Sequence, residues 1–472
     1  LKNEGGNIYR VSVGKIPAVF LDKELEYNIL FISNKNSCLY NVLYNLDSYA
    51  SGLLDMGMYL DSLTYSSKKI KSNYTPKRLA VKLNAKGEQF VTQGHPWVFS
   101  NNITKINDDA KSGDLAIIFG KNKNRVVGLG LFDGNSPIRI KMLHSSIEKA
   151  EINAEFFQNK IKEAYNKRQP LLRTNTNSYR LLFGENDGFP GLIADVYASI
   201  LVVKIYSEIW LPYLETIIPS LQQTSKSETV VIRLSRSLEQ SKSHNLNNGD
   251  VVYGVLENEV VEFVEHGVNF SANVIKGHKT GYFLDHRANR KQVGEWSKGK
   301  TVLDVFSYAG GFSVHALYNG AKEVTSLDIS KQALEIALQN GELNNYKGKH
   351  KTIVGDAFAE LKNLIKNKIT FDVVVIDPPS FAKQASEIEL AKKKYSQLAQ
   401  LGEQLTSKNG LLVLASCSSR VLAQAFFDIN SQMLTSTERR YKVVLKTEHD
   451  TDHPIGFTEG AYLKCAYYRF LD

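Results

Sequence analysis

The feature that most constrains the fold is a regular alternation of apolar strand-like segments and amphipathic helical segments that begins near residue 301. The strand-like segments cover 301–305, 323–328, 351–354, 371–376 and 410–415. This alternation predicts parallel βαβ units in a doubly wound, Rossmann-like α/β sheet. Ligands of such sheets bind outside the carboxyl ends of the strands, so the residues at those ends are the first candidates for chemistry.

The turn after the first of these strands carries a glycine pair but not the dinucleotide-binding fingerprint. Gly310 and Gly311 allow a sharp backbone turn and a close approach to a ligand. Phe306 and Tyr308 occupy positions where GxGxxG has glycine, so a pyrophosphate cradle is not favoured. The alternative is that the glycine pair only shapes the turn.

Carboxylates recur at the strand ends. Asp304 ends the first strand, Asp328 the second, Asp356 follows the third and Asp377 the fourth. Asp328 can accept hydrogen bonds from both ribose hydroxyls of a nucleoside cofactor. Asp356 is placed to bond an adenine amino group. Any one of them could be a helix cap, but their recurrence favours a nucleoside-binding site.

These strand ends resemble those of class I S-adenosylmethionine (SAM)-dependent methyltransferases. The DPPSF segment resembles motif IV of nucleic-acid base methyltransferases. The chain is similar to bacterial 23S rRNA cytosine-C5 methyltransferases of the RlmI type over residues 77–472. The segments that carry the resemblance are GHPWVFS (94–100), ENDGFPGL (185–192), EHG (265–267), GHKTGYFLDHR (277–287), FSYAGGFSVHA (306–316), DPPSF (377–381), SCS (416–418) and DHP…EGAYLK (452–464).

The resemblance implies that SAM is the cofactor. It also implies that segment 279–287 closes over SAM, with Phe283 on the adenine side and with Asp285 and Arg287 at polar ends of the cofactor; an ordinary loop–helix junction is the alternative. The cofactor-binding residues that we expect are Asp304, Phe306, Ser307, Tyr308, Gly310, Asp328, Asp356, Asp377, Phe283, Asp285 and Arg287. No His, Asp or Glu cluster has the spacing of a metal site.

Cys417 and Asp377 are the predicted catalytic residues. Cys417 directly follows an apolar strand, which places it at a carboxyl end near Asp377. A Cys417 thiolate can add to C6 of cytosine and make C5 nucleophilic, and a lowered thiol pKa would help this step. Asp377 can hydrogen-bond the cytosine ring N3 or amino group. The alternative for Cys417 is an inert small hydrophobe.

Three functions compete. The first is an enzyme that makes 5-methylcytosine in 23S rRNA. The second is a guanine-N rRNA methyltransferase on the same fold, which needs no thiol. The third is a non-catalytic RNA-binding or ribosome-assembly protein that retains the fold. The intact Asp304, Asp328, Asp356, Asp377 and Cys417 favour catalysis.

The rest of the chain divides into three further parts. Residues 1–76 follow no clear period beyond short strands at 9–13 and 18–21, and 68–77 is typical of a linker. Short strands in 77–150 predict a small β-barrel, which the family resemblance implies is a PUA-like RNA-binding domain. Residues 151–275 predict a central mixed α/β domain, and 276–472 form the methyltransferase domain.

Charge and amino-acid composition limit the partners and the cellular compartment that we expect for this chain. Residues 77–150 contain 12 basic and 6 acidic side chains, an excess typical of an RNA-binding surface and also of a solvated face. Within this region, we expect Trp97 to pack in the core. Three cysteines without a CxxC pair indicate a reducing, cytoplasmic compartment, and no apolar run is long enough to span a membrane. The sequence leaves open whether two copies form a homodimer.

Overall fold

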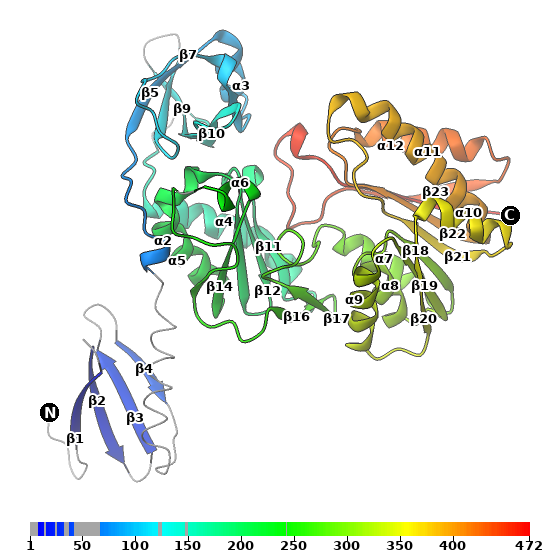
Figure 1. The fold of residues 1–472 in the computed structure, drawn as a ribbon, viewed down its shortest axis with the longest axis horizontal. Coiled ribbons are helices and arrows are strands. Elements are labelled where there is room, and N and C mark those ends of the chain that lie inside the picture. Colours follow the sequence, from blue (N-terminus) through cyan, green and yellow to red (C-terminus); the bar gives the residue numbers. More distant parts are fainter. Residues whose placement is uncertain are drawn as a thin grey trace. The chain divides into compact units, whose positions relative to one another are not determined.

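A computed structural model describes residues 67–472 except 121–124, 147–149 and 242, together with the backbone of four strands before residue 42. The chain divides into two units, one of residues 1–66 with 253–255 and one of residues 67–252 with 256–472. The first unit contains an antiparallel sheet of β1 (Ile8–Val13), β2 (Ile16–Lys23), β3 (Glu26–Ile32) and β4 (Ser37–Asn41), labelled in Figure 1. The two predicted short strands are therefore confirmed.

The segment predicted as a linker, residues 68–77, is part of the second unit and makes hydrogen bonds within it. It begins with α2 (Ser67–Ile70). Further along, the Tyr74 hydroxyl donates to Asp114 Oδ1 at 2.5 Å, and the Lys77 backbone N–H donates to the same oxygen at 2.7 Å. The boundary between the two units accordingly lies at 66/67, ten residues before the predicted boundary at 76/77.

The basic module is a six-stranded sheet in the order β6-β10-β9-β8-β5-β7. Its strands are β5 (Arg78–Leu83), β6 (Trp97–Phe99), β7 (Ile103–Lys105), β8 (Leu115–Phe119), β9 (Val126–Phe132) and β10 (Ile138–His144), with α3 (Ala85–Thr92) after β5. Alternate residues of β5 are buried, which places Leu79, Val81 and Leu83 in one core.

The central region is mixed α/β, as predicted. Its sheet contains β11 (Ser178–Phe183), β12 (Leu192–Tyr197), β13 (Ile200–Ile205), β14 (Thr229–Leu234) and β15 (Val251–Tyr253) in that order. The helices α4 (Ala154–Leu172) and α5 (Leu214–Ser225) pack against each other, and a short α6 (Arg236–Glu239) follows β14. A hairpin of β16 (Val260–Glu265) and β17 (Val268–Asn273) leads into the last region.

The last region is the predicted doubly wound sheet, in the order β20-β19-β18-β21-β22-β24-β23. The strands β18 (Thr301–Val305), β19 (Glu323–Asp328), β20 (Lys349–Val354), β21 (Phe371–Ile376) and β22 (Thr406–Ser416) are parallel. Two antiparallel strands, β24 (Lys464–Phe470) and β23 (Tyr441–Thr447), complete one edge. Strands β19 and β20 lie on one side of β18, and β21 and β22 lie on the other. The strand order therefore reverses between β18 and β21, and ligands of such sheets bind at the carboxyl ends of the strands beside this point.

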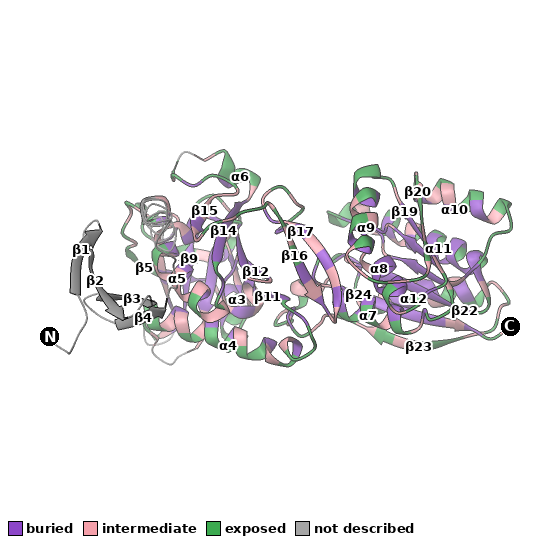
Figure 2. Cartoon of the chain, turned by 90° about the horizontal axis from the view of Figure 1, so that it is seen from below, coloured by how far each residue is buried: buried purple, intermediate pink, exposed green. Residues whose placement is uncertain are grey.

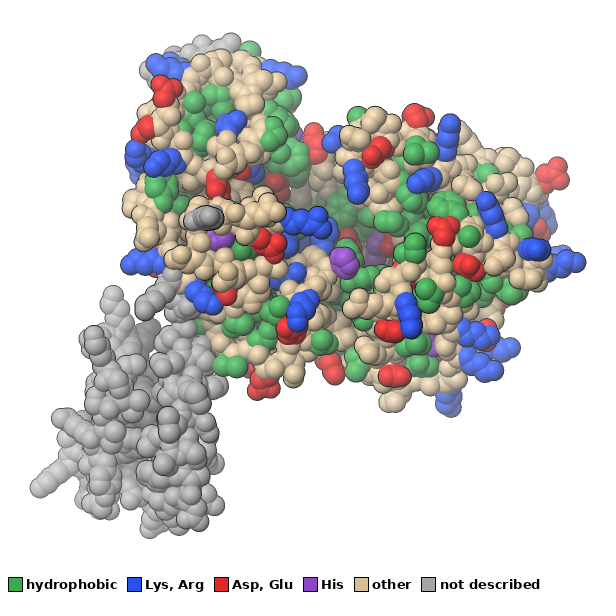
Figure 3. Space-filling view, viewed as in Figure 1, with side chains coloured by type: hydrophobic (Ala, Val, Ile, Leu, Met, Phe, Trp, Pro, Cys, Tyr) green, Lys and Arg blue, Asp and Glu red, His purple; other side chains and the backbone are tan. Residues whose placement is uncertain are grey.

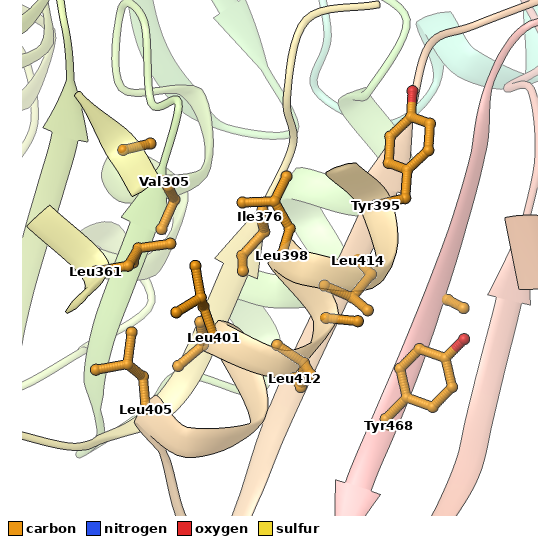
Figure 4. Packing of buried hydrophobic residues seen from close by; sticks show 14 of the residues in the cluster. Val305, Leu361, Ile376, Tyr395, Leu398, Leu401, Leu405, Leu412, Leu414 and Tyr468 are labelled. Atoms are coloured by element: carbon orange, nitrogen blue, oxygen red, sulfur yellow. The ribbon is translucent and has the colours of Figure 1, made fainter. Parts of the chain in front are cut away.

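Helices cover both faces of this sheet. Val374 and Ile376 of β21 pack into one core with α10 (Ala357–Lys366), α11 (Ile388–Leu405) and α12 (Ala423–Thr435), part of which Figure 4 shows. Val373 and Val375 pack into the opposite core with α7 (Arg287–Glu295) and α8 (Gly311–Tyr318), and α9 (Lys331–Glu342) lies beside α8. Figure 2 shows the buried strands between the more exposed outer faces of the helices. Only the strand ends and their loops are therefore free to form a site.

Candidate active site

A cavity of about 1190 Å³ opens at the carboxyl ends of the parallel strands. Its wall includes the turns after β18, β19, β21 and β22, the segment around Phe283, strand β12 of the central sheet, and the loop that contains His453 and Tyr462. Residues of the basic module, including Trp97 and Lys141, also line it. The cavity therefore joins parts of the chain that the sequence analysis treated as separate domains.

The turn after β18 has an unusual backbone. Phe306 and Tyr308 have φ angles of 63° and 47°, in the left-handed region that residues other than glycine rarely adopt. Between them, the Ser307 hydroxyl is buried without a hydrogen-bond partner in the described part of the chain. All three residues line the cavity. Such backbone strain persists only where the surrounding structure enforces it, and it is typical of ligand-binding loops.

Asp328 lies beneath this turn. Its Oδ2 accepts a hydrogen bond from the Tyr308 backbone N–H at 3.0 Å, and its Oδ1 accepts one from the Ser330 N–H at 2.9 Å. The two bonds fix the carboxylate on the cavity wall while each oxygen keeps a further lone pair. A vicinal diol in the cavity can donate to those lone pairs, as predicted for a ribose.

Four predicted cofactor residues, Asp304, Gly310, Asp356 and Arg287, are not among the residues that line the cavity. Asp356 is the N-cap of α10 and accepts from the Ala359 N–H at 3.0 Å. Gly310 has φ 77°, and a Cβ there would come within 2.7 Å of the Ala337 Cβ on α9. Its lack of a side chain therefore allows α9 to pack closely against this turn.

Asp304 is the third of these residues. It is 1% exposed, and its Oδ2 accepts bonds from the Ser313 N–H at 3.0 Å and from the Ser313 hydroxyl at 2.6 Å. Burial raises the pKa of Asp304 to about 7, despite the bonds from Ser313. Asp304 thus ties β18 to the start of α8 from behind the turn.

Arg287 lies in a buried ion-pair cluster rather than in the cavity. It is fully buried, and its Nη2 lies 3.0 Å from Asp452 Oδ2, with Asp450 and Glu265 also within 4 Å. Glu265 accepts two bonds from Arg290 at 2.7 Å. Burial opposes the charge of Asp452, but Arg287 holds its pKa well below the usual value. Arg287 joins the β16–β17 hairpin to the C-terminal loop.

Cys417 and Asp377, the predicted catalytic residues, both lie on the cavity wall. The Cys417 thiol lies 3.8 Å from the Pro378 carbonyl oxygen, to which it can donate, and both Cys417 and Asp377 line the cavity. The electrostatic environment differs from the prediction. Burial raises the pKa of Cys417 to about 12, with further increases from Asp377 and Asp285. The lowered pKa that would favour the thiolate is therefore not found, first because the thiol is buried and second because the carboxylates nearby oppose a further negative charge.

Phe283 and Asp285 also line the cavity. Phe283 is 38% exposed, and its ring lies edge-on to the Tyr308 ring at 5.3 Å. Asp285 Oδ2 accepts a bond from the Tyr462 hydroxyl at 2.9 Å. Burial favours a raised pKa for Asp285, but the neighbouring His286 and His453 outweigh it and bring the pKa to about 2. Asp285 is therefore a carboxylate at neutral pH.

The sequence analysis gave no role to His286 and placed Trp97 in the core of its module, but both line the cavity. His286 Nε2 lies 3.3 Å from Asp377 Oδ1, a contact that no sequence spacing indicates. Trp97 is half-buried on the cavity wall instead of in the core of its module. Its Nε1–H donates to Glu185 Oε1 at 3.1 Å, and its ring lies 5.0 Å from that of Phe457.

The residues on the wall fit SAM. Asp328 suits the ribose hydroxyls, Phe283 offers an apolar face for adenine, and the unpartnered Ser307 hydroxyl can bond a polar end of the methionyl group. No group of three potential metal ligands occurs among the described residues. In the same part of the chain, none of the helices is long and apolar enough to cross a membrane.

Comparisons with known proteins agree with this arrangement. The S-adenosylmethionine-dependent methyltransferase family matches residues 179–432, and the PUA-like domain matches residues 81–145. A presumed SAM-dependent methyltransferase from Streptococcus mutans has a similar fold, with a TM-score of 0.69, 21% identity and coverage of 83% of this chain and 99% of that one. A presumed methyltransferase complexed with SAH gives the same TM-score and identity.

Sequence relatives extend over most of the chain. The ribosomal RNA large subunit methyltransferase of Deinococcus radiodurans is 36% identical over 397 residues, which are 83% of this chain and 97% of that protein. Ribosomal RNA large subunit methyltransferase I of Aeromonas salmonicida is 33% identical over 80% of this chain and 96% of that protein. The chain therefore belongs to the family of S-adenosylmethionine-dependent ribosomal RNA large subunit methyltransferases.

Proposed function

We propose that this enzyme methylates C5 of a cytosine in 23S rRNA through a covalent adduct with Cys417. The observation that carries the proposal is the position of Cys417, whose thiol faces the Pro378 carbonyl at 3.8 Å in the cavity that Asp328 also lines. A nucleophile and a cofactor site in one cavity are what this reaction needs, because cytosine C5 is too weak a nucleophile unless C6 is first attacked.

The chemistry assigns a separate task to each residue. The Cys417 sulfur forms a bond to C6, and the electron pair of the C5–C6 double bond makes C5 nucleophilic. SAM supplies the methyl group that C5 takes up. A base then removes the C5 proton, the double bond re-forms and the Cys417 thiolate leaves. Asp377 can accept a hydrogen bond from the cytosine amino group, and from N3 once N3 takes up a proton as negative charge develops on the ring.

The electrostatics of the cavity restrict when Cys417 reacts. A thiol with a pKa of about 12 is protonated at neutral pH, so the resting protein holds very little thiolate. The thiol proton must pass to a base before or as the sulfur attacks C6, and the cationic sulfonium group of SAM would oppose the part of the increase that comes from the carboxylates.

We propose that the RNA contacts the basic module. Affinity would come from phosphate contacts by exposed members of the 12 basic side chains of residues 77–150. Figure 3 shows Lys and Arg side chains over this module and over the methyltransferase domain. The target base must leave its stack to reach Cys417. We further propose that the protein acts in the cytoplasm, because its proposed substrate is ribosomal RNA.

Substitution of Cys417 tests the mechanism. Cys417→Ala should abolish methyl transfer and leave SAM and RNA binding intact, because alanine fits the space of the thiol. RNA with 5-fluorocytidine at the target should trap the wild-type protein covalently, since fluorine cannot leave as a proton does. Cys465→Ala is the matched control: Cys465 is fully buried in β24 and should not affect the adduct.

The assay separates the competing functions. Near-normal turnover by Cys417→Ala would reject the thiolate mechanism and favour a guanine-N methyltransferase. Mass spectrometry of nucleosides from the methylated RNA would then identify the modified base. If the wild-type protein binds SAM and 23S rRNA but transfers no methyl group to free RNA or to ribosomal particles, it acts as an RNA-binding protein.

A further inference from the structure

Two buried polar atoms face each other behind the proposed nucleobase site. His286 Nε2 and Asp377 Oδ1 are 3.3 Å apart, and neither atom has a hydrogen-bond partner of normal geometry among the described residues. The His286 side chain is 6% exposed and that of Asp377 is 23% exposed. Two atoms left without other partners cost free energy unless they bond to each other. Catalytic hydrogen bonds are often long before the substrate binds.

The other side of the imidazole determines which nitrogen carries the proton. Asn289 Nδ2 lies 3.1 Å from His286 Nδ1. The Asn289 Oδ1 accepts bonds from the hydroxyls of Thr447 at 2.6 Å and Tyr467 at 2.8 Å. These two donors fix the amide with its NH₂ group toward the imidazole. An NH₂ group can only donate, so His286 Nδ1 must be the acceptor.

It follows that the proton of the neutral imidazole is on Nε2 and points at Asp377. Burial lowers the pKa of His286, and the Asp377 carboxylate raises it above its ordinary value. The Asn289 amide opposes a second proton, because a protonated Nδ1 would place two donors against each other. Phe312, whose ring centre lies 5.6 Å from that of His286, limits rotation of the imidazole.

We propose that His286 is a positioning residue that holds Asp377 in its working orientation by donating a hydrogen bond from Nε2–H to Oδ1. The donor occupies Oδ1 and leaves the remaining lone pairs of the carboxylate for the nucleobase. Asp377 directly follows β21, and Thr447 and Tyr467 lie on β23 and β24. The chain of hydrogen bonds through Asn289 and His286 therefore connects the carboxylate to these two strands. The proposal rests on the proposed role of Asp377 in binding the target base.

The test compares His286→Ala with His286→Gln in the full-length protein. Loss of one donor to a charged group should lower kcat about 10- to 100-fold in His286→Ala, with the affinity for SAM unchanged. Glutamine places an N–H donor at the reach of imidazole Nε2 but does not titrate near neutral pH. His286→Gln should therefore restore most of kcat and keep the wild-type pH profile. His244→Ala, a control outside the cavity lining, should retain wild-type kcat.

If His286 instead transferred protons, His286→Gln would be as inactive as His286→Ala, and this result would overturn the proposal. A second readout does not depend on activity. Nitrogen-15 NMR of histidine-labelled protein, with the His286 signal assigned from its loss in His286→Gln, should show a proton on Nε2 at neutral pH. An Nε2 without a proton would also overturn the proposal. Both readouts remain valid if the product is not 5-methylcytosine, so the two proposals can fail separately.

Discussion

Asp304→Asn should make the stability of the ligand-free protein less sensitive to pH. The Asp304 side chain is almost completely buried, Oδ2 accepts two bonds from Ser313, and Oδ1 has no hydrogen-bond partner among the described residues. Asparagine has nearly the same shape, and its amide oxygen can accept both bonds from Ser313. The substitution therefore removes the titration and changes little else.

The sign follows from the pKa of about 7, which burial raises from an ordinary value of 3.8. Between these values the folded protein holds a proton that the unfolded chain has lost, so the free energy of unfolding falls as the pH rises and levels off above about 7. Over the whole range between the two pKa values, the free energy of unfolding falls by about 4 kcal/mol. Solvent screens this effect little, because Asp304 is 1% exposed. About 2 kcal/mol of it is lost between about pH 5.5 and pH 8.5.

Urea unfolding at several pH values measures this effect. Tryptophan fluorescence is a suitable signal, because Trp296 packs against the methyltransferase sheet. The stability of Asp304→Asn relative to wild type should improve by about 2 kcal/mol from about pH 5.5 to pH 8.5. Asp428→Asn, at an exposed position on α12, should follow the wild-type profile. Parallel profiles for Asp304→Asn and wild type would refute the reasoning, because they would mean that Asp304 is already ionised at neutral pH.

Two further predictions concern other carboxylates. Glu265→Gln should cost about 3–5 kcal/mol of unfolding free energy, because it leaves the Arg290 guanidinium buried without its ionic partner; urea unfolding measures the loss, and a cost below about 1 kcal/mol would contradict it. Asp328→Ala should weaken SAM binding by about 1–3 kcal/mol in calorimetric titration. Asp356→Ala, which removes a helix cap away from the cavity lining, should alter the affinity far less, and equal effects of the two substitutions would argue against the ribose contact.

The sequence by itself determined the parallel strands and the residues at their ends. Strands β18, β19 and β21 match the predicted bounds because each is a short, largely apolar run with a carboxylate within one residue of its end. Asp328, Asp377 and Cys417 line one cavity as predicted, since the carboxyl ends of parallel strands meet at the same edge of a sheet. These features depend only on local sequence, namely on the apolar runs and on the residues at their ends.

Only the tertiary structure decided which side chains meet from distant segments and in what electrostatic environment. Tyr462 contacts Asp285, which lies 177 positions away in the sequence. His286 faces Asp377 because α7 packs against β21, the strand that directly precedes Asp377. The raised pKa of Cys417 likewise depends on burial and on two carboxylates from other segments. Desolvation and charge interactions depend on distance in space, which a sequence pattern does not specify.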